Sequence, residues 1–399
     1  GPVSITVVCL ALLPALVSAD ARVWLKNGPV DGMALGKVGA WRGIPYAAPP
    51  IGDLRWRPPR PPQAWGTTPL NATQFKHNCF QNMNMGWKTE PLETQSEDCL
   101  YLNVYAPLVN PGKTLPVMLW IYGGGYQGGG GNETRLNGTW DVALTHEDIV
   151  VVTFNYRLNI FGFAASDMLR NRDPAGGTGN YGILDQRMAM QWVHDNIQAF
   201  GGDPSHVLIV GQSAGASSVS NHLVRQKSWG LFSSAGMESG AFYEGKEKQY
   251  AVKDKEPHFA ALMRAAGCSV LECLVQLPPV KLLYLQMSPG NWDLWNPVID
   301  GVDLIDSGVN LAAKGHLAPV PILAGSVMED LFLFTRITCI PSKCNESDFR
   351  KFMETAGFNS TEVDDAVNLY GDEVLRPGGT GHTHWYWAQK HAGSDSWAF

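Results

Sequence analysis

The stretch VGQSAGA, residues 210–216, has the strongest influence on how this sequence is interpreted. It places Ser213 between two glycines, after the apolar residues VLIV and before a run of small residues. A strand, a tight turn and a helix in this order form a nucleophile elbow, which exposes a serine hydroxyl at a strained backbone position. Side chains at Gly211 and Gly215 would collide with the neighbouring strand and helix, and the helix directs the positive end of its dipole at the serine. We predict that Ser213 is a nucleophile; the alternative is a serine in an ordinary turn.

Strand and helix patterns alternate along the rest of the chain. Apolar or β-branched runs predict strands at 99–107, 115–122, 148–156 and 319–326, the last three buried on both faces. Residues 182–200 carry apolar side chains at helical spacing, and Gly201-Gly202 ends that helix. Residues 22–65 are rich in proline, so we expect irregular chain wrapped on the surface there. The alternation predicts an α/β fold with a parallel or mixed sheet.

An acyl-transfer nucleophile also needs hydrogen-bond donors for the oxygen that becomes negatively charged in the transition state. Gly123-Gly124-Gly125 follow directly after the predicted strand 115–122. Backbone N–H groups of this loop and of Ala214 can converge on one oxygen, where each donor contributes about 3–4 kcal/mol. The alternative interpretation is a flexible hinge, because Gly128–Gly131 adds a second glycine run.

Composition and charge restrict the class of protein. Hydrophobic residues make up 45% of the 399 residues and charged residues 17%, which excludes a disordered or coiled-coil chain. A net charge of −7 over this length, with no cluster of lysine and arginine, argues against a nucleic-acid partner. We interpret residues 20–399 as one catalytic domain.

The first residues resemble a leader for secretion. An apolar run ends in Val17-Ser18-Ala19, which fits signal-peptidase cleavage after Ala19, although the charged start of such a leader is absent. We therefore interpret residues 1–19 as an incomplete signal peptide; the alternatives are a short membrane anchor or a buried strand. No later stretch is long and apolar enough for a membrane span.

The cysteines and asparagines are consistent with a secreted protein. Six cysteines remain after Ala19, and their grouping suggests the bridges Cys79–Cys99, Cys268–Cys273 and Cys339–Cys344. Their spacing does not suit zinc, so we expect no metal and no other cofactor. Glycosylation sequons begin at Asn71, Asn132, Asn137, Asn345 and Asn359. The chain is therefore expected to be a secreted, disulfide-bonded glycoprotein.

Several blocks together resemble the type B carboxylesterase/cholinesterase family of α/β-hydrolases. Between residue 39 and about residue 330 these blocks run in family order: GIPYAAPPIGDLRW, EDCLYLNVYAP, WIYGGGYQGG, NYRLNIFGF, GNYGILDQRMAMQWVHDNIQAFGGDP, VGQSAGASSVSNHL and NPVIDG. The resemblance implies an α/β-hydrolase fold and a serine hydrolase acting on small carboxylic esters. It also implies that Gly124, Gly125 and Ala214 donate to the oxyanion, and it supports the Cys79–Cys99 bridge.

The resemblance also indicates where the other members of a catalytic triad belong. In AGSVMEDLF, Asp330 stands at the family's spacing for the triad acid, where glutamate is more usual, and Glu329 is the alternative. A third interpretation is an exposed acidic turn. The family's histidine follows about a hundred residues after the acid, beyond Phe399, so we interpret the chain as part of a longer protein. His382, His384 and His391 are expected to be bystanders, and His194 and His222 to be satisfied core or supporting residues.

The substrate is the least specified property. Phe242, Trp292 and Trp295 are candidates for an apolar cleft, or equally for core packing. Trp87 lies in the Cys79–Cys99 loop, where cholinesterases hold a quaternary ammonium by cation–π contact, but the alignment there is loose. We expect a broad carboxylesterase. The alternatives are a cholinesterase, a lipase, or a non-catalytic adhesion or scaffold relative.

Overall fold

The computed structural model describes residues 21–81, 91–109, 112–133, 138–242, 250–286, 295–327, 343–356 and 358–370, with Tyr386 and Ala388. The leader expected at residues 1–19 lies outside this part of the chain.

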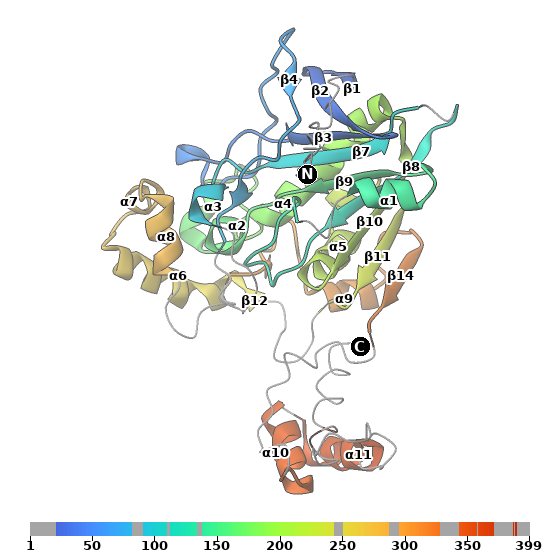
Figure 1. Cartoon of the computed structure of the whole chain (residues 1–399). Helices are drawn as coiled ribbons and strands as arrows, with labels where there is room; N and C mark the ends of the chain where they lie inside the picture. Colours follow the sequence, from blue (N-terminus) through green and yellow to red (C-terminus); the bar gives the residue numbers. More distant parts are fainter. Residues whose placement is uncertain are drawn as a thin grey trace, which may run out of the picture.

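A mixed sheet runs through the centre of the structure (Figure 1). Its strand order is β1-β2-β3-β7-β9-β8-β10-β11-β14, and β4 pairs with β2. Pairing is antiparallel from β1 through β7 to β9 and parallel from β9 to β14. The strands are Ala21–Leu25 (β1), Gly28–Leu35 (β2), Val38–Pro45 (β3), Leu70–Asn71 (β4), Tyr101–Pro107 (β7), Leu115–Ile121 (β8), Val150–Phe154 (β9), Gly202–Gln212 (β10), Ser234–Glu238 (β11) and Ile322–Gly325 (β14).

The strands predicted from apolar runs are present as β7, β8, β9 and β14. β9 is buried along its whole length, as expected. The expectation of burial on both faces is wrong for β8, in which buried residues alternate with exposed or half-buried ones. The expectation of a buried strand at 319–326 is wrong, because all four residues of β14 are exposed, Leu323 to 79%. β14 is the last strand in the sheet order, and among the described strands it pairs with β11 alone. An apolar run predicts that a strand forms, whereas the exposure of the strand's residues depends on which elements pack against it.

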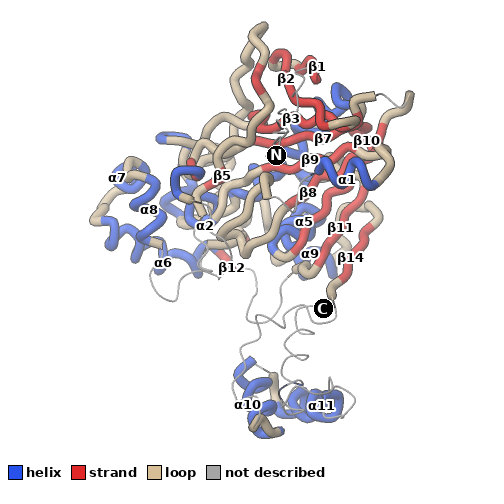
Figure 2. The backbone as a smooth tube through the Cα atoms, in the orientation of Figure 1, coloured by secondary structure: helices blue, strands red, loops and turns tan. Residues whose placement is uncertain are grey.

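Helices lie on both faces of the sheet (Figure 2). α4 (Tyr181–Asn196) and α5 (Ala214–Val224) pack into the main apolar core, and α1 (Gly138–Leu144) packs against the opposite face of β7 and β9. The helix expected at 182–200 is α4 followed by a 3-10 turn, Ile197–Phe200, and it ends at Gly201 in the left-handed conformation, as expected. The other helices are Asn159–Phe163 (α2), Asp167–Arg170 (α3), Val252–Ala266 (α6), Leu271–Val275 (α7), Pro279–Leu285 (α8), Gly308–Ala313 (α9), Glu346–Ala356 (α10) and Ser360–Tyr370 (α11).

The expectation of irregular surface chain at residues 22–65 is wrong for its first half. β1, β2 and β3 occupy residues 21–45 and pair antiparallel, because most of the prolines lie beyond them. From Tyr46 onward the chain is irregular apart from the 3-10 turn Gly52–Leu54, and most of residues 51–65 are exposed or half-buried, as expected, although a few side chains are buried. Tyr46 and Trp56 are fully buried. Arg55 pairs with Glu97 at 2.6 Å and also donates to the carbonyl of Val275, so buried side chains anchor this segment to the core.

Two disulfides join the expected cysteines, Cys79 to Cys99 and Cys268 to Cys273. Cys344 is disulfide-bonded as well, and its expected partner Cys339 lies outside the described residues. Two short pairs of strands complete the structure: Asn78–Cys79 (β5) with Gln95–Ser96 (β6), and Tyr250–Ala251 (β12) with Val298–Ile299 (β13). Among the described helices, none has the length and apolar character needed to cross a membrane.

Candidate active site

Ser213 occupies the junction between β10 and α5. Its backbone is in the left-handed region, with φ 57° and ψ −125°, which a residue with a side chain rarely adopts. Such a conformation costs roughly 1–3 kcal/mol and persists only where the surroundings impose it. Two hydrogen bonds do so here: Ser213 N donates to the carbonyl of Glu238 at 2.9 Å, and the Ser213 carbonyl accepts from Ser217 N at 2.9 Å. The hydroxyl of Ser213 makes no hydrogen bond to any described residue.

The two glycines of the motif allow β8 and α5 to approach the turn closely. A Cβ atom at Gly211 would lie 2.6 Å from the carbonyl oxygen of Ile121, and a Cβ atom at Gly215 would collide with the same oxygen. Both contacts are with backbone atoms, which cannot rotate away as a flexible side chain would. The collision predicted from the sequence is therefore present, and its partner is the end of β8.

The glycine loop that follows β8 lies beside Ser213. A Cβ atom built on Gly123 would be 3.1 Å from the Cβ atom of Ser213 and 2.5 Å from the carbonyl oxygen of Gln212. Gly124 and Gly125 have φ angles of 107° and 62°. The carbonyl of Gly124 accepts from Gln127 N at 2.9 Å and from Gly128 N at 3.2 Å, so the backbone there folds into a closed turn.

Hydrogen bonds with distant segments hold this glycine loop in place. Gln127 Nε2 donates to the carbonyl of Trp295 at 2.9 Å, and Asn159 N donates to the carbonyl of Tyr126 at 2.7 Å. The amide of Gln81 exchanges two hydrogen bonds of 3.1 Å with the backbone of Gly129. These contacts argue against a flexible hinge. The sequence carries no signal for them, since isolated Asn and Gln residues are common.

Ala214 is the first residue of α5, an eleven-residue helix. Its N–H group is one of the first N–H groups of the helix, which lack partners within the helix and lie at its positive dipole end. Ala214 and the glycine loop belong to two separate elements that meet at Ser213.

The candidate triad acids, Asp330 and Glu329, lie outside the described residues. The strand that precedes them in the sequence, β14, runs parallel to β11 with Gly325 in register with Glu238. Ser239 N donates to the carbonyl of Gly325 at 2.8 Å. The carboxyl ends of β10, β11 and β14 therefore lie along one edge of the sheet, the edge at which Ser213 is located.

The histidines fall into three groups. His382, His384 and His391 lie outside the described residues. His194 is on the exposed side of α4, with its side chain 48% exposed beside Asp195, so the expectation of a core or supporting role is wrong for it. His222 on α5 is fully buried, with Nε2 3.0 Å from Gln186 Oε1 and Nδ1 2.9 Å from Ser228 Oγ. Burial and the nearby charges of Arg187 and Arg225 hold the pKa of His222 well below its usual value.

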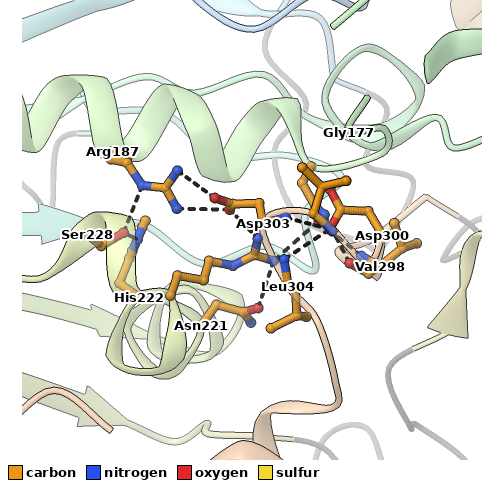
Figure 3. A network of polar contacts seen from close by, with 12 residues as sticks. Gly177, Arg187, Asn221, His222, Ser228, Val298, Asp300, Asp303 and Leu304 are labelled. Carbon is orange, nitrogen blue, oxygen red and sulfur yellow. Dashed lines mark hydrogen bonds and ion pairs between the residues drawn. The ribbon is translucent and has the colours of Figure 1, made fainter. Parts of the chain in front are cut away.

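A buried ionic cluster lies between α4 and α5 (Figure 3). Asp303 accepts two hydrogen bonds of 2.8 Å from Arg187 and one of 2.5 Å from Arg225. Burial alone would raise the pKa of Asp303, but the two guanidinium groups outweigh it and hold that pKa well below its usual range. The cluster fastens the segment that follows Trp295 to α4 and α5. Because Trp295 itself binds Gln127, this segment also supports the glycine loop.

We predict that Asp303→Asn destabilises the protein by about 3 kcal/mol or more at neutral pH, because the buried Arg225 and the largely buried Arg187 lose the anion that they share. The pKa of Asp303 is lower in the folded state than in the unfolded chain. Its contribution is therefore complete above about pH 5, begins to decline as the pH falls below about 4, and is lost only as the pH falls through the much lower pKa of the folded state. Urea unfolding at pH 7 measures the first effect, and urea unfolding at a series of pH values from about 5 down to about 2 measures the second.

The matched control is Asp31→Asn. Asp31 makes the same two-point contact with Arg22, but this pair is exposed at the outer edge of the sheet. Solvent screens it, so its loss should change stability far less. Equal effects of the two substitutions at pH 7 would contradict the role assigned to the buried cluster.

The fold and the junction at Ser213 define an α/β-hydrolase. The chain matches the carboxylesterase family over residues 19–384, and it belongs to that family. It is 37% identical over 314 residues to fumonisin B1 esterase of Sphingopyxis macrogoltabida, covering 78% of this chain and 56% of that protein. It is 36% identical to the cholinesterase of Mus musculus, covering 80% of this chain and 55% of that one. The chain thus spans a little over half the length of these relatives.

The fold comparison agrees. The carboxylesterase EST55 of Geobacillus stearothermophilus superposes with a TM-score of 0.76 at 33% identity, covering 92% of this chain and 72% of the enzyme. The predicted α/β-hydrolase fold is therefore confirmed.

Proposed function

We propose that the whole protein is a serine hydrolase that cleaves carboxylic esters through an acyl-enzyme intermediate on Ser213. The observation that carries this proposal is the position of Ser213: a strained strand–helix junction, at the start of a helix and beside the glycine loop. Strain at one serine, maintained by two close-packed glycines, is typical of a nucleophile elbow.

In the first half of the proposed reaction, Ser213 Oγ forms a bond to the ester carbonyl carbon and its proton passes to a histidine base. Asp330 is proposed to orient that histidine, as the family resemblance implies. The carbonyl oxygen becomes an oxyanion that accepts hydrogen bonds from the N–H groups of Gly124, Gly125 and Ala214. The bond to the alcohol then breaks, and the alcohol leaves with the proton from the histidine. In the second half, water repeats these steps on the acyl-enzyme and releases the carboxylic acid.

We propose a small-molecule ester as substrate, without selectivity for choline. The relatives are named for different substrates, and the loop residue that would select choline, Trp87, lies outside the described residues. The other cleft candidates support core packing: Trp295 is buried, and the ring of Phe242 fills the space above Gly308. Trp292 also lies outside the described residues.

The decisive experiment is reaction of the full-length protein with a fluorophosphonate probe, followed by peptide mass spectrometry. We expect one adduct, on Ser213, which is absent in Ser213→Ala. If the folded protein forms no adduct while a control esterase does, this result would contradict the proposal that the protein is an enzyme. It would favour a non-catalytic adhesion or scaffold relative.

We also propose that the protein is a secreted glycoprotein. The asparagines of three sequons, Asn71, Asn345 and Asn359, are exposed, whereas Asn132 is half-buried and Asn137 lies outside the described residues. Asn71 Oδ1 accepts hydrogen bonds from both the N–H and the hydroxyl of Thr73, the third residue of its sequon.

We expect glycan at Asn71 when a eukaryotic host secretes the protein. After enzymatic removal of N-glycans, conversion of Asn71 to aspartate would be detected by mass spectrometry; an unmodified asparagine would refute the assignment.

A further inference from the structure

One buried hydroxyl connects the two elements that are proposed to bind the oxyanion. Ser218 lies on α5 one turn after Ala214 and is fully buried. Its Oγ donates to the carbonyl of Ala214 at 2.9 Å and lies 3.5 Å from the hydroxyl of Tyr126, in the glycine loop. It also accepts from Gln186 Nε2 of α4 at 3.0 Å. Three separate elements therefore meet at this oxygen.

The hydrogen bonds behind Ser218 take one direction when Gln186 Nε2 is the donor to Ser218. Because Gln186 Nε2 donates to Ser218, its Oε1 faces His222 and can only accept, so His222 carries its proton on Nε2. Nδ1 of His222 then accepts from the hydroxyl of Ser228, and that oxygen accepts from Arg187 Nε at 2.9 Å. Figure 3 shows the first part of this chain, with Arg187, Ser228 and His222 beside Asp303. This series of hydrogen bonds runs from the ionic cluster to the carbonyl of Ala214.

Burial reinforces this direction. His222 is neutral because its pKa is held well below the usual value, so its ring keeps one donor and one acceptor. The side chains of Gln186 and Ser218 are excluded from water as well. A buried chain in which every group has its partner is rigid, because reversing one member would leave its neighbours unpaired.

We propose that Ser218 is a positioning residue for the oxyanion site, and this inference rests on the proposed function. Oxyanion donors are effective when they are held in place before the charge develops. Here the donors come from α5 and from the loop after β8, so their relative position must be maintained by contacts between the two elements. Ser218 makes such a contact and is fixed from behind by Gln186.

The test compares Ser218→Ala with Ser220→Ala in the full-length enzyme, using a p-nitrophenyl ester. Ser220 is the matched control: it is on the same helix and equally buried, and its hydroxyl donates within the helix, to the carbonyl of Ser217 at 2.8 Å. We expect Ser218→Ala to lower kcat about tenfold with KM within twofold, since misplacement of catalytic groups affects the transition state most. Ser220→Ala should leave kcat within about twofold of the wild type.

A second readout separates positioning from general structural damage. A trifluoromethyl ketone that adds to Ser213 generates an oxyanion in the same site, so its affinity should fall by the same factor as kcat/KM in Ser218→Ala. Ser218→Cys, which keeps a weaker hydrogen-bonding group of similar shape, should restore part of kcat. If Ser218→Ala does not fold, the cysteine variant replaces it, with a smaller expected loss of kcat.

The outcomes are distinguishable. Equal kcat values for the Ser218 and Ser220 variants, or a rise in KM at unchanged kcat, would overturn the positioning role. Absence of a fluorophosphonate adduct on Ser213 in the wild-type protein would overturn the proposed function instead.

Discussion

Ser213→Ala is expected to lower ester hydrolysis by the full-length protein by about 10⁴-fold or more, with no loss of folded structure. Alanine removes the only atom proposed to bond to the substrate carbonyl and keeps the size of the residue. The oxyanion donors and the binding surface remain, so a small rate above that in water should persist. Steady-state kinetics with a p-nitrophenyl ester and circular dichroism of both proteins measure the two quantities.

Ser213→Gly is the informative companion variant. Both substitutions remove the hydroxyl, but glycine adopts a φ of 57° without strain, whereas alanine does not. Ser213→Gly should therefore be inactive and more stable than Ser213→Ala by about 1 kcal/mol or more. If Ser213→Ala retained even a tenth of the wild-type activity, Ser213 could not be the nucleophile.

Gly215→Ala is expected to have the largest effect on stability of any single methyl group added at the site. The new Cβ atom would collide with the carbonyl oxygen of Ile121, so α5 or the end of β8 must shift. Overpacking typically destabilises a protein by about 1–3 kcal/mol, and we expect a loss at the upper end of this range because the backbone of Ile121 cannot rotate away. Urea unfolding followed by tryptophan fluorescence, together with the yield of soluble protein, measures the loss.

Gly325→Ala provides the control for this substitution. Gly325 is also at the carboxyl edge of the sheet, but a Cβ atom there would have no atom of the described residues within 4 Å, and its φ angle is not in the left-handed region. Its replacement should change the free energy of unfolding by less than about 0.5 kcal/mol. Wild-type stability of Gly215→Ala would show that the close approach of β8 and α5 is not required.

Features that depend on neighbours in the sequence were predictable. The apolar run, the glycines and the small residues around Ser213 specify strand, turn and helix within about twenty residues, because each preference is satisfied locally. The same holds for α4 and its glycine end. The disulfides Cys79–Cys99 and Cys268–Cys273 also followed from the order of the cysteines.

Features that depend on distant partners were not predictable. The exposure of β14 and the difference between exposed His194 and buried His222 are determined by which element covers each residue. β1 to β3 were missed because their pairing with one another and with β7 outweighs the proline content around them.

The sequence by itself determined the family, the elbow and the identity of the nucleophile candidate, because the motif is contiguous and its glycines have a steric reason. Only the tertiary structure decided how the glycine loop is held, since Gln81, Asn159 and Trp295 approach it from segments far apart in the chain. It alone also brought Gln186, Ser218 and His222 into one buried chain of hydrogen bonds. The physical reason is that a hydrogen bond depends on distance and direction in space, which three separate elements establish only when they pack together.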